Sequence, residues 1–113
     1  MARLPLPEPL PGGPLGELLR SLHGLHQRAG WPSTRELARR ADVPMSHMSV
    51  RDVFVKPKLP SLPKLMAIVT VMARMAPRIE VERTQEIFDE LWTKAAEAGP
   101  DSPSADTDTS EDN

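Results

Sequence analysis

The sequence contains no cysteine, few aromatic residues and no long hydrophobic run. Without cysteine, the chain can form no disulfide, and it offers no thiolate to bind zinc or to attack a substrate. Two tryptophans and two phenylalanines are few for a core, so leucine, valine and methionine must supply most of the buried volume. Residues 65–75 form the longest apolar stretch, but Thr70 and Arg74 interrupt it and it is too short to span a bilayer.

The N-terminal residues also lack the pattern of a signal peptide. Prolines alternate through MARLPLPEPLPGGPLG, and they would break the continuous apolar helix that a signal peptide needs. Because the sequence shows neither a leader nor a membrane span, we expect a soluble, cytoplasmic protein.

Charge is unevenly divided along the chain. The formal net charge is −2, from 14 lysines and arginines against 16 aspartates and glutamates. All 14 cations lie at or before Lys94, where ten acids accompany them, whereas the residues from Ala95 onward carry six acids and no cation. The body is therefore mildly basic and the C-terminal part acidic. An excess of four positive charges is modest, so any affinity for phosphates must come from clustering.

These patterns divide the chain into three segments around one small domain. Residues 1–14 hold five prolines and two glycines and predict a flexible arm. Residues 97–113 have almost no apolar side chain to bury and predict an acidic, disordered tail. Between them, residues 15–96 show helical periodicity and no alternating strand pattern. We predict an all-α fold, a compact bundle of about five helices that contains a helix-turn-helix.

Local signals place the five helices. Leucines three and four residues apart give residues 15–29 one apolar stripe, and Gly30 follows as a C-cap. Ser33 and Glu36 form the S-x-x-E capping box of a second helix, over residues 35–41. Three further helices are expected over residues 46–54, 61–75 and 81–96, the last with a stripe of Ile87, Phe88, Leu91, Trp92 and Ala95.

The fourth of these helices is apolar on more than one side. Its first stripe consists of Leu62, Leu65, Val69 and Met72, and its second stripe of Ile68, Val71 and Met75. Either the helix is central and buried from several directions, or the second stripe is a surface for a homodimer or a partner protein.

Residues 33–54, STRELARRADVPMSHMSVRDVF, are the most informative part of the chain. They read as two short helices around a turn, with Leu37 facing inward from the first and Val50, Val53 and Phe54 from the second. A short helix, a turn and an exposed second helix form the helix-turn-helix that enters the major groove of DNA.

The runs LRSLHGLHQRAGWPSTRELARRADV, VRDVFVKPKLPSLPKL and FDELWTKAA resemble the XRE-type (lambda-repressor-like) helix-turn-helix domain of actinobacterial regulators. The resemblance covers about residues 15–96, and its most specific part is S-x-R-E-L-A-R-R-A. It implies a bundle of about five helices whose third helix reads bases. The family usually has glycine after the second helix, where this chain has Asp42, and the turn here is about two residues longer.

The expected DNA contacts begin with the third helix, whose N-terminal side chains would reach base edges. The candidates there are His47, Met48, Ser49 and Arg51. Arg51 is the best single choice because a guanidinium can pair with guanine through two hydrogen bonds. The alternative is that Arg51 pairs with Asp52 or Asp42, or contacts a phosphate. Asp52 would itself repel phosphate unless Arg51 or a lysine neutralised it.

Other side chains are expected at the phosphate backbone. Thr34 and Arg35 begin the second helix, where free amides and the helix dipole attract an anion. Lys56 and Lys58 follow the third helix, at positions that the resemblance assigns to backbone contact. Their alternative is solvated loop charge. Arg39 and Arg40 lie in the last turn of the second helix, and we interpret them as structural or solubilising.

No arrangement in the sequence indicates catalysis or a cofactor. His23 and His26 are three residues apart, but no carboxylate or cysteine joins them at ligand spacing. We therefore interpret both as surface residues of the first helix and expect no metal site. No nucleophile elbow, phosphate loop or zinc-protease helix is present.

The sequence thus predicts a sequence-specific, DNA-binding transcription regulator that acts on double-stranded DNA, in the form of a homodimer or with a partner protein. The alternative keeps the fold and makes it a protein–protein interaction module without strong DNA binding. The low net charge and the absence of an effector domain favour that alternative. A further hypothesis is that the acidic tail competes with DNA for the basic surface.

Overall fold

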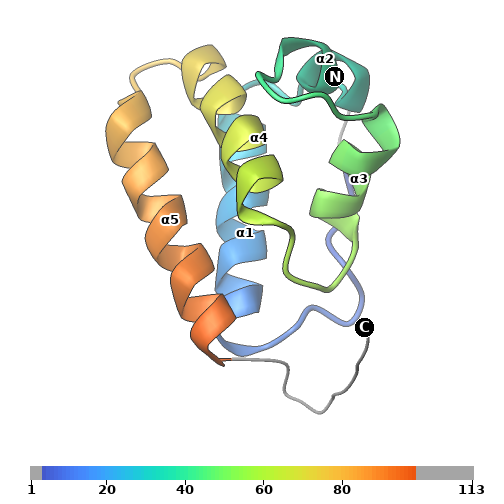
Figure 1. Cartoon of the computed structure of the whole chain (residues 1–113), viewed down its shortest axis with the longest axis vertical. Helices are drawn as coiled ribbons and strands as arrows, with labels where there is room; N and C mark the ends of the chain where they lie inside the picture. The colour runs from blue at the N-terminus through green and yellow to red at the C-terminus, as the bar shows by residue number, and fades with distance from the viewer. Residues whose placement is uncertain (1–3, 99–113) are drawn as a thin grey trace.

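The protein is a bundle of five α-helices, and the computed structural model describes residues 4–98. In chain order the helices are α1 (Gly13–Arg28), α2 (Thr34–Arg40), α3 (His47–Val55), α4 (Leu62–Met75) and α5 (Val81–Ala98). No strand occurs in the described part of the chain, so the predicted all-α bundle is confirmed. In Figure 1, α3 and α5 lie on opposite sides of α1 and α4.

Local signals set the ends of the helices, as the sequence indicated. After α1, the amide of Gly30 donates to the carbonyl of Gln27 and the amide of Trp31 to that of His26. These two bonds form a Schellman motif, with Gly30 at φ 89°. Ser33 and Ser46 are the N-caps of α2 and α3, and each hydroxyl accepts an amide of the first turn.

Helix α4 is the centre of the bundle and packs against the other four helices. Both of its apolar stripes are used there: Leu65, Ile68, Val69, Val71 and Met72 are all at most 5% exposed. Met75 is half-buried and also packs against the core. The second stripe is therefore part of the core, and the alternative that made it a homodimer or partner surface is wrong.

Helix α5 covers one side of α1 and α4 through Phe88, Leu91 and Ala95. The sequence analysis placed Ile87 in this stripe, but the residue does not belong to it. It lies one position off the buried row and is 39% exposed. A side-chain bond from Gln85 Nε2 to the Thr70 hydroxyl, 2.9 Å long, satisfies the buried hydroxyl of α4. The helix also continues through Ala98, so residues 97 and 98 are helical.

The described residues before α1 run alongside the body. Leu4 packs against the core and Pro7 is buried, so this part of the predicted arm is in contact with the bundle. Gly16 lies so close to Pro11 that a Cβ at this position would collide with the Pro11 carbonyl. The rest of the arm, residues 1–3, and residues 99–113 of the predicted tail lie outside the described residues.

Candidate nucleic-acid interface

The turn between α2 and α3 spans residues 41–46 and is longer than the three or four residues of many helix-turn-helix motifs. Ala41 leaves α2 in an extended conformation, with φ −68° and ψ 145°. Asp42 does not take the left-handed conformation that glycine favours. In residues 4–98, only Trp31 and Arg78 do so among the non-glycine residues. The extra turn length thus replaces the left-handed exit that a glycine would provide.

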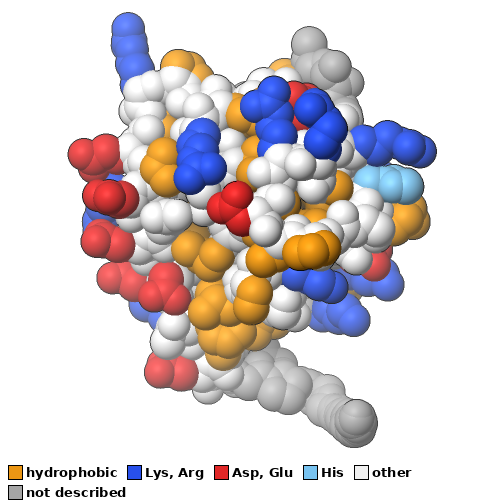
Figure 2. Space-filling model, turned by 45° about the horizontal axis from the view of Figure 1, so that its top comes forward, with side chains coloured by type: hydrophobic (Ala, Val, Ile, Leu, Met, Phe, Trp, Pro, Cys, Tyr) orange, Lys and Arg blue, Asp and Glu red, His pale blue; other side chains and the backbone are white. Residues whose placement is uncertain are grey.

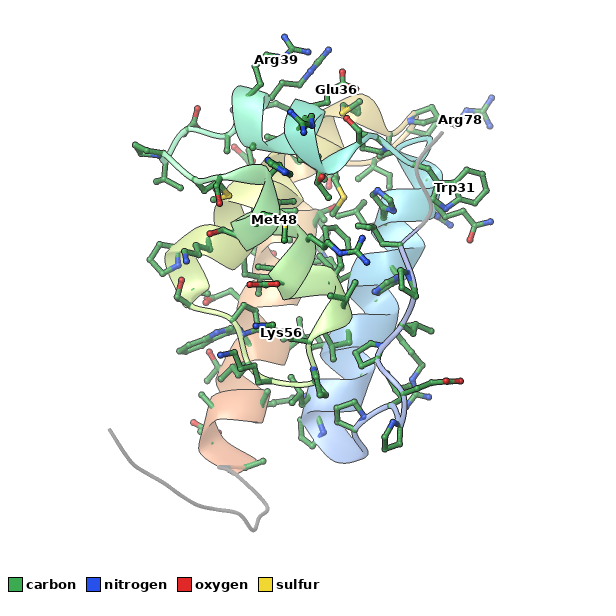
Figure 3. All side chains as sticks on the ribbon, turned by 90° about the vertical axis from the view of Figure 1, so that its right-hand side faces the viewer. Trp31, Glu36, Arg39, Met48, Lys56 and Arg78 are labelled. Atoms are coloured by element: carbon green, nitrogen blue, oxygen red, sulfur yellow. The ribbon has the colours of Figure 1, made fainter. Side chains whose placement is uncertain are left out.

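Helix α3 buries one side and exposes the other. Val50, Val53 and Phe54 are at most 5% exposed, which confirms the inward side that the sequence predicted. At 100° per residue, Met48, Asp52 and the C-cap residue Lys56 follow one another on the opposite side. Figure 3 shows Met48 and Lys56 on the same face of the molecule. Met48 is 54% exposed, so an apolar side chain stands at the outermost N-terminal position of α3.

Arg51 lies on the flank of this outer row and is exposed. The structure records neither an ion pair nor a hydrogen bond for its guanidinium within the described residues. Asp52 pairs instead with Lys56, with 3.6 Å between Oδ2 and Nζ. The expected repulsion of phosphate by Asp52 is thereby offset by a lysine. No group among residues 4–98 occupies the donors of Arg51.

The other two side chains at the start of α3 are less available. Ser46 Oγ accepts the Ser49 amide at 3.0 Å and lies 3.3 Å from the Ser49 hydroxyl. Ser49 is half-buried, as is His47, the first residue of the helix. The N-cap thus already uses part of the hydrogen-bonding capacity that the sequence assigned to base readout at Ser49.

At the N-terminus of α2, Thr34 is half-buried and Arg35 is exposed. The Ser33 hydroxyl accepts the Glu36 amide at 3.1 Å, which is one half of the predicted capping box. The Glu36 carboxylate pairs with Arg40 at 2.9 Å and lies 3.9 Å from Arg39. With only seven residues in α2, its dipole is small, so Arg35 carries most of the attraction for an anion here.

Lys58 lies in the loop between α3 and α4 and is exposed, like Lys56. Within residues 4–98 no ion pair of Lys58 is recorded. The structure thus brings Met48, Arg51, Lys56 and Lys58 together on and directly after α3. Thr34 and Arg35 belong to the neighbouring helix α2, which packs against α3.

Two histidines of α1, which the sequence analysis placed on the surface, connect the α2–turn–α3 unit to the rest of the bundle. His23 Nε2 donates to the Phe54 carbonyl and His26 Nε2 to the Pro32 carbonyl, each at 2.8 Å. His26 is 1% exposed, and both rings pack against Phe54, with centroids 5.4 and 4.9 Å away. The surface interpretation was wrong for His26, which lies on the leucine stripe, four residues after Leu22, whereas His23 is half-buried.

The surroundings of His26 also affect its protonation. Burial lowers its pKa from the ordinary value of 6.5, because the charged imidazolium loses solvation. The bond to the Pro32 carbonyl partly opposes this effect, and the nearby His23 adds to it. His26 therefore favours the neutral form, in which Nε2 carries the donated proton.

Charge is separated across the molecule. Residues 34–64, which contain α2 and α3, hold seven lysines and arginines against three acids. Residues 80–98 hold six acids against two cations. Figure 2 shows acidic side chains gathered at the left edge, where α5 lies in Figure 1, and most lysines and arginines at the top and right. A polyanion would therefore be attracted to the α2–α3 side.

The described part of the chain, residues 4–98, has no group of three or more histidine, aspartate or glutamate side chains positioned to hold a metal ion. None of its helices has the length and apolarity needed to cross a membrane. Comparisons of the chain with protein-family models, with curated proteins and with solved structures found no match.

Proposed function

We propose that this protein is a DNA-binding transcription regulator of the XRE (lambda-repressor-like) type, in which α3 enters the major groove. Arg51 would read a base, Met48 would contact a thymine methyl, and Lys56, Lys58 and Arg35 would bind phosphates. Such a role implies a cytoplasmic location, where the DNA is accessible.

The observation that carries the proposal is the arrangement of side chains on α3. Its apolar side is used completely by the core, while its outer side presents Met48, Arg51 and Lys56 to solvent. Because Arg51 has no ion pair with any residue from 4 to 98, it breaks none of those contacts when it binds a guanine or a phosphate. The excess of four positive charges over residues 34–64 supports attraction to a phosphate backbone.

The choice between DNA binding and a protein interaction module also depends on available apolar surface. A large exposed apolar patch often marks a docking site for a protein, but the stripe of α4 that offered one is buried. Over the described residues, the exposed large hydrophobic side chains are Leu6, Met48 and Ile87. Met48 belongs to the proposed groove contact, so DNA is the better supported partner. A homodimer that reads two half-sites remains part of the proposal, with an interface elsewhere than α4.

The proposal is tested by titrating the protein with random and selected duplexes at several salt concentrations. Because each bound phosphate releases counterions, the logarithm of the affinity should fall linearly with the logarithm of salt, with a slope of roughly −0.9 per contact. Selection of bound duplexes from a random pool should return one preferred site. Binding that is absent at low salt, or that shows no sequence preference after selection, would contradict sequence-specific recognition.

A further inference from the structure

The last turns of α5 lie beside the loop that follows α3. Trp92 Nε1 donates to the Pro60 carbonyl at 2.8 Å, which joins two residues far apart in sequence. Pro60 is two residues from Lys58 and four from Lys56. The C-terminal part of α5 is therefore held next to the cationic loop of the proposed interface.

The chain leaves α5 close to this contact. Ala98, the last residue of α5, lies six residues after Trp92, a rise of about 9 Å along the helix. Fifteen residues follow it, 99–113, and at full extension they span up to about 50 Å. The whole described body measures 38 × 26 × 25 Å. Residues 99–113 are thus long enough to reach both the loop and α3.

The surfaces that residues 99–113 can reach differ in charge. Residues 99–113 contain five acids and no cation, namely Asp101, Asp106, Asp108, Glu111 and Asp112. Helix α5 repels such a segment, because Glu80 directly before it and Glu82, Glu86, Asp89 and Glu90 on it are exposed and outnumber its two cations, Arg83 and Lys94. Arg51 and Lys58 have no recorded ion pair within the described residues. Both side chains are exposed and are therefore available to accept negative charge from this segment.

We propose that residues 99–113 bind the cationic surface formed by Arg51, Lys56 and Lys58, as an intramolecular competitor of DNA. The contact between the segment and the cationic surface is inferred from their charges and positions. The competition with DNA rests on the proposed function. Covalent attachment holds the acidic segment near this surface at an effective concentration of about millimolar. A weak contact is then sufficient to occupy the surface. DNA, with its higher charge density, displaces the segment, whereas weaker polyanions bind less.

The test compares the full-length protein with a variant whose acidic segment is neutral. That variant carries Asp101→Asn, Asp106→Asn, Asp108→Asn, Glu111→Gln and Asp112→Asn. A matched control removes the same number of negative charges from α5 and the residue before it, through Glu80→Gln, Glu82→Gln, Glu86→Gln, Asp89→Asn and Glu90→Gln. Both variants keep the chain length, and the control separates a local contact from a general effect of net charge.

The first readout is the backbone amide spectrum, which needs no DNA. At low salt, neutralising residues 99–113 should shift the amide signals of Arg51, Lys56 and Lys58, and the difference should vanish at about 0.5 M salt, where screening is strong. Unchanged signals at these residues would overturn the contact. Differences that grow with protein concentration would assign the segment to a second copy of the chain and overturn the intramolecular form.

The second readout is the affinity for random duplex. The neutral-segment variant should bind about three- to tenfold more tightly than the wild type at low salt, and the α5 control should gain less. Equal gains by both variants would overturn the competition. Amide shifts without DNA binding by any variant would leave the contact standing and remove the proposed function. DNA binding without amide shifts would leave the proposed function standing and overturn the contact.

Discussion

At the scale of single residues, His23 and His26 connect α1 to the helix-turn-helix. The Phe54 carbonyl that His23 binds belongs to the last turn of α3, where carbonyls have no partner within the helix. The Pro32 carbonyl that His26 binds directly precedes the N-cap of α2. One pair of imidazoles thus fixes the start of α2 and the end of α3 relative to the same face of α1.

Because His26 is buried, the stability of the protein should depend on pH. The unfolded chain takes up a proton at His26 near pH 6.5, whereas the folded protein does so only at lower pH. Between these two values the unfolded state binds more protons, so the free energy of unfolding should fall as the pH is lowered from about 7 through the folded pKa. Denaturant titrations at a series of pH values measure this decline.

The matched variants for this prediction are His26→Gln and His47→Gln. Glutamine at position 26 can still donate to the Pro32 carbonyl but cannot take up a proton, so the decline below pH 6.5 should become shallower. His47→Gln removes an imidazole from α3 without altering the contacts of α1, and the decline should stay. A wild-type slope retained by His26→Gln would show that other groups cause the acid sensitivity.

The proposed DNA contacts also differ at the residue scale. Arg51→Ala should cost about 1–3 kcal/mol on the preferred duplex and relax the preference at one base pair, because base readout is lost. Lys58→Ala should weaken all duplexes alike and reduce the salt slope by about one contact. Competition titrations with single-base variants of the selected site measure both effects.

The control for these variants is Arg83→Ala, which removes one positive charge from α5, where Arg83 pairs with Glu86. It should change affinity less than Lys58→Ala. Lys58 serves better than Lys56 here, because removing Lys56 would also leave Asp52 unpaired beside the phosphates. Equal losses on every duplex from Arg51→Ala and Lys58→Ala would make Arg51 a phosphate contact.

At the scale of the helices, local chemistry explains which features could be predicted from sequence. Gly30, Ser33 and Ser46 act on amides and carbonyls only a few residues away, so their roles are visible in the sequence. The carbonyl partners of His23 and Trp92 lie 31 and 32 residues away. They depend on the packing of whole helices, which no short pattern contains.

In the candidate site, too, features that depend on local spacing could be predicted from the sequence, whereas the choice between alternative partners could not. The buried side of α3 could be predicted from the spacing of Val50, Val53 and Phe54, and Arg51 was correctly expected outside it. The pairing of Asp52 with Lys56 was not specified, since the sequence equally allowed Arg51 to neutralise Asp52. The burial of both stripes of α4 was one of two alternatives, because an apolar side looks the same whether its neighbour is the same chain or another protein.

Two glycines of α1 provide a prediction about how this helix meets the N-terminal segment. Gly16→Ala should lower the free energy of unfolding by about 1–3 kcal/mol, because the new Cβ collides with the Pro11 carbonyl. Gly24→Ala should raise it by about 0.5–1 kcal/mol, because alanine favours the helix and no atom lies within 4 Å of its Cβ. Denaturant unfolding of both variants measures the difference. If Gly16→Ala were also stabilising, residues 4–12 would not be packed as described.

At the scale of the whole molecule, one core joins all five helices. Leu18, Leu37, Val50, Leu65 and Phe88, one from each helix, belong to a single cluster of buried residues. The helix-turn-helix therefore has no core of its own. Its position relative to α5 is maintained by the central helix α4 and by the bond from Trp92 to the Pro60 carbonyl. Any ligand of α3 should accordingly stabilise the entire fold by mass action.

A shared core predicts that the protein unfolds in one cooperative transition. The two tryptophans report on different regions, since Trp31 lies between α1 and α2 and Trp92 lies in α5. Trp31→Phe and Trp92→Phe each leave one fluorescent probe. In either variant, the fluorescence and far-ultraviolet circular dichroism should give the same midpoint in denaturant. Trp92→Phe should shift that midpoint lower, because the bond to the Pro60 carbonyl contributes about 1 kcal/mol. If the Trp31 signal changed at lower denaturant than the helical signal in the same variant, the helix-turn-helix would unfold separately, and α4 would not couple it to the rest of the bundle.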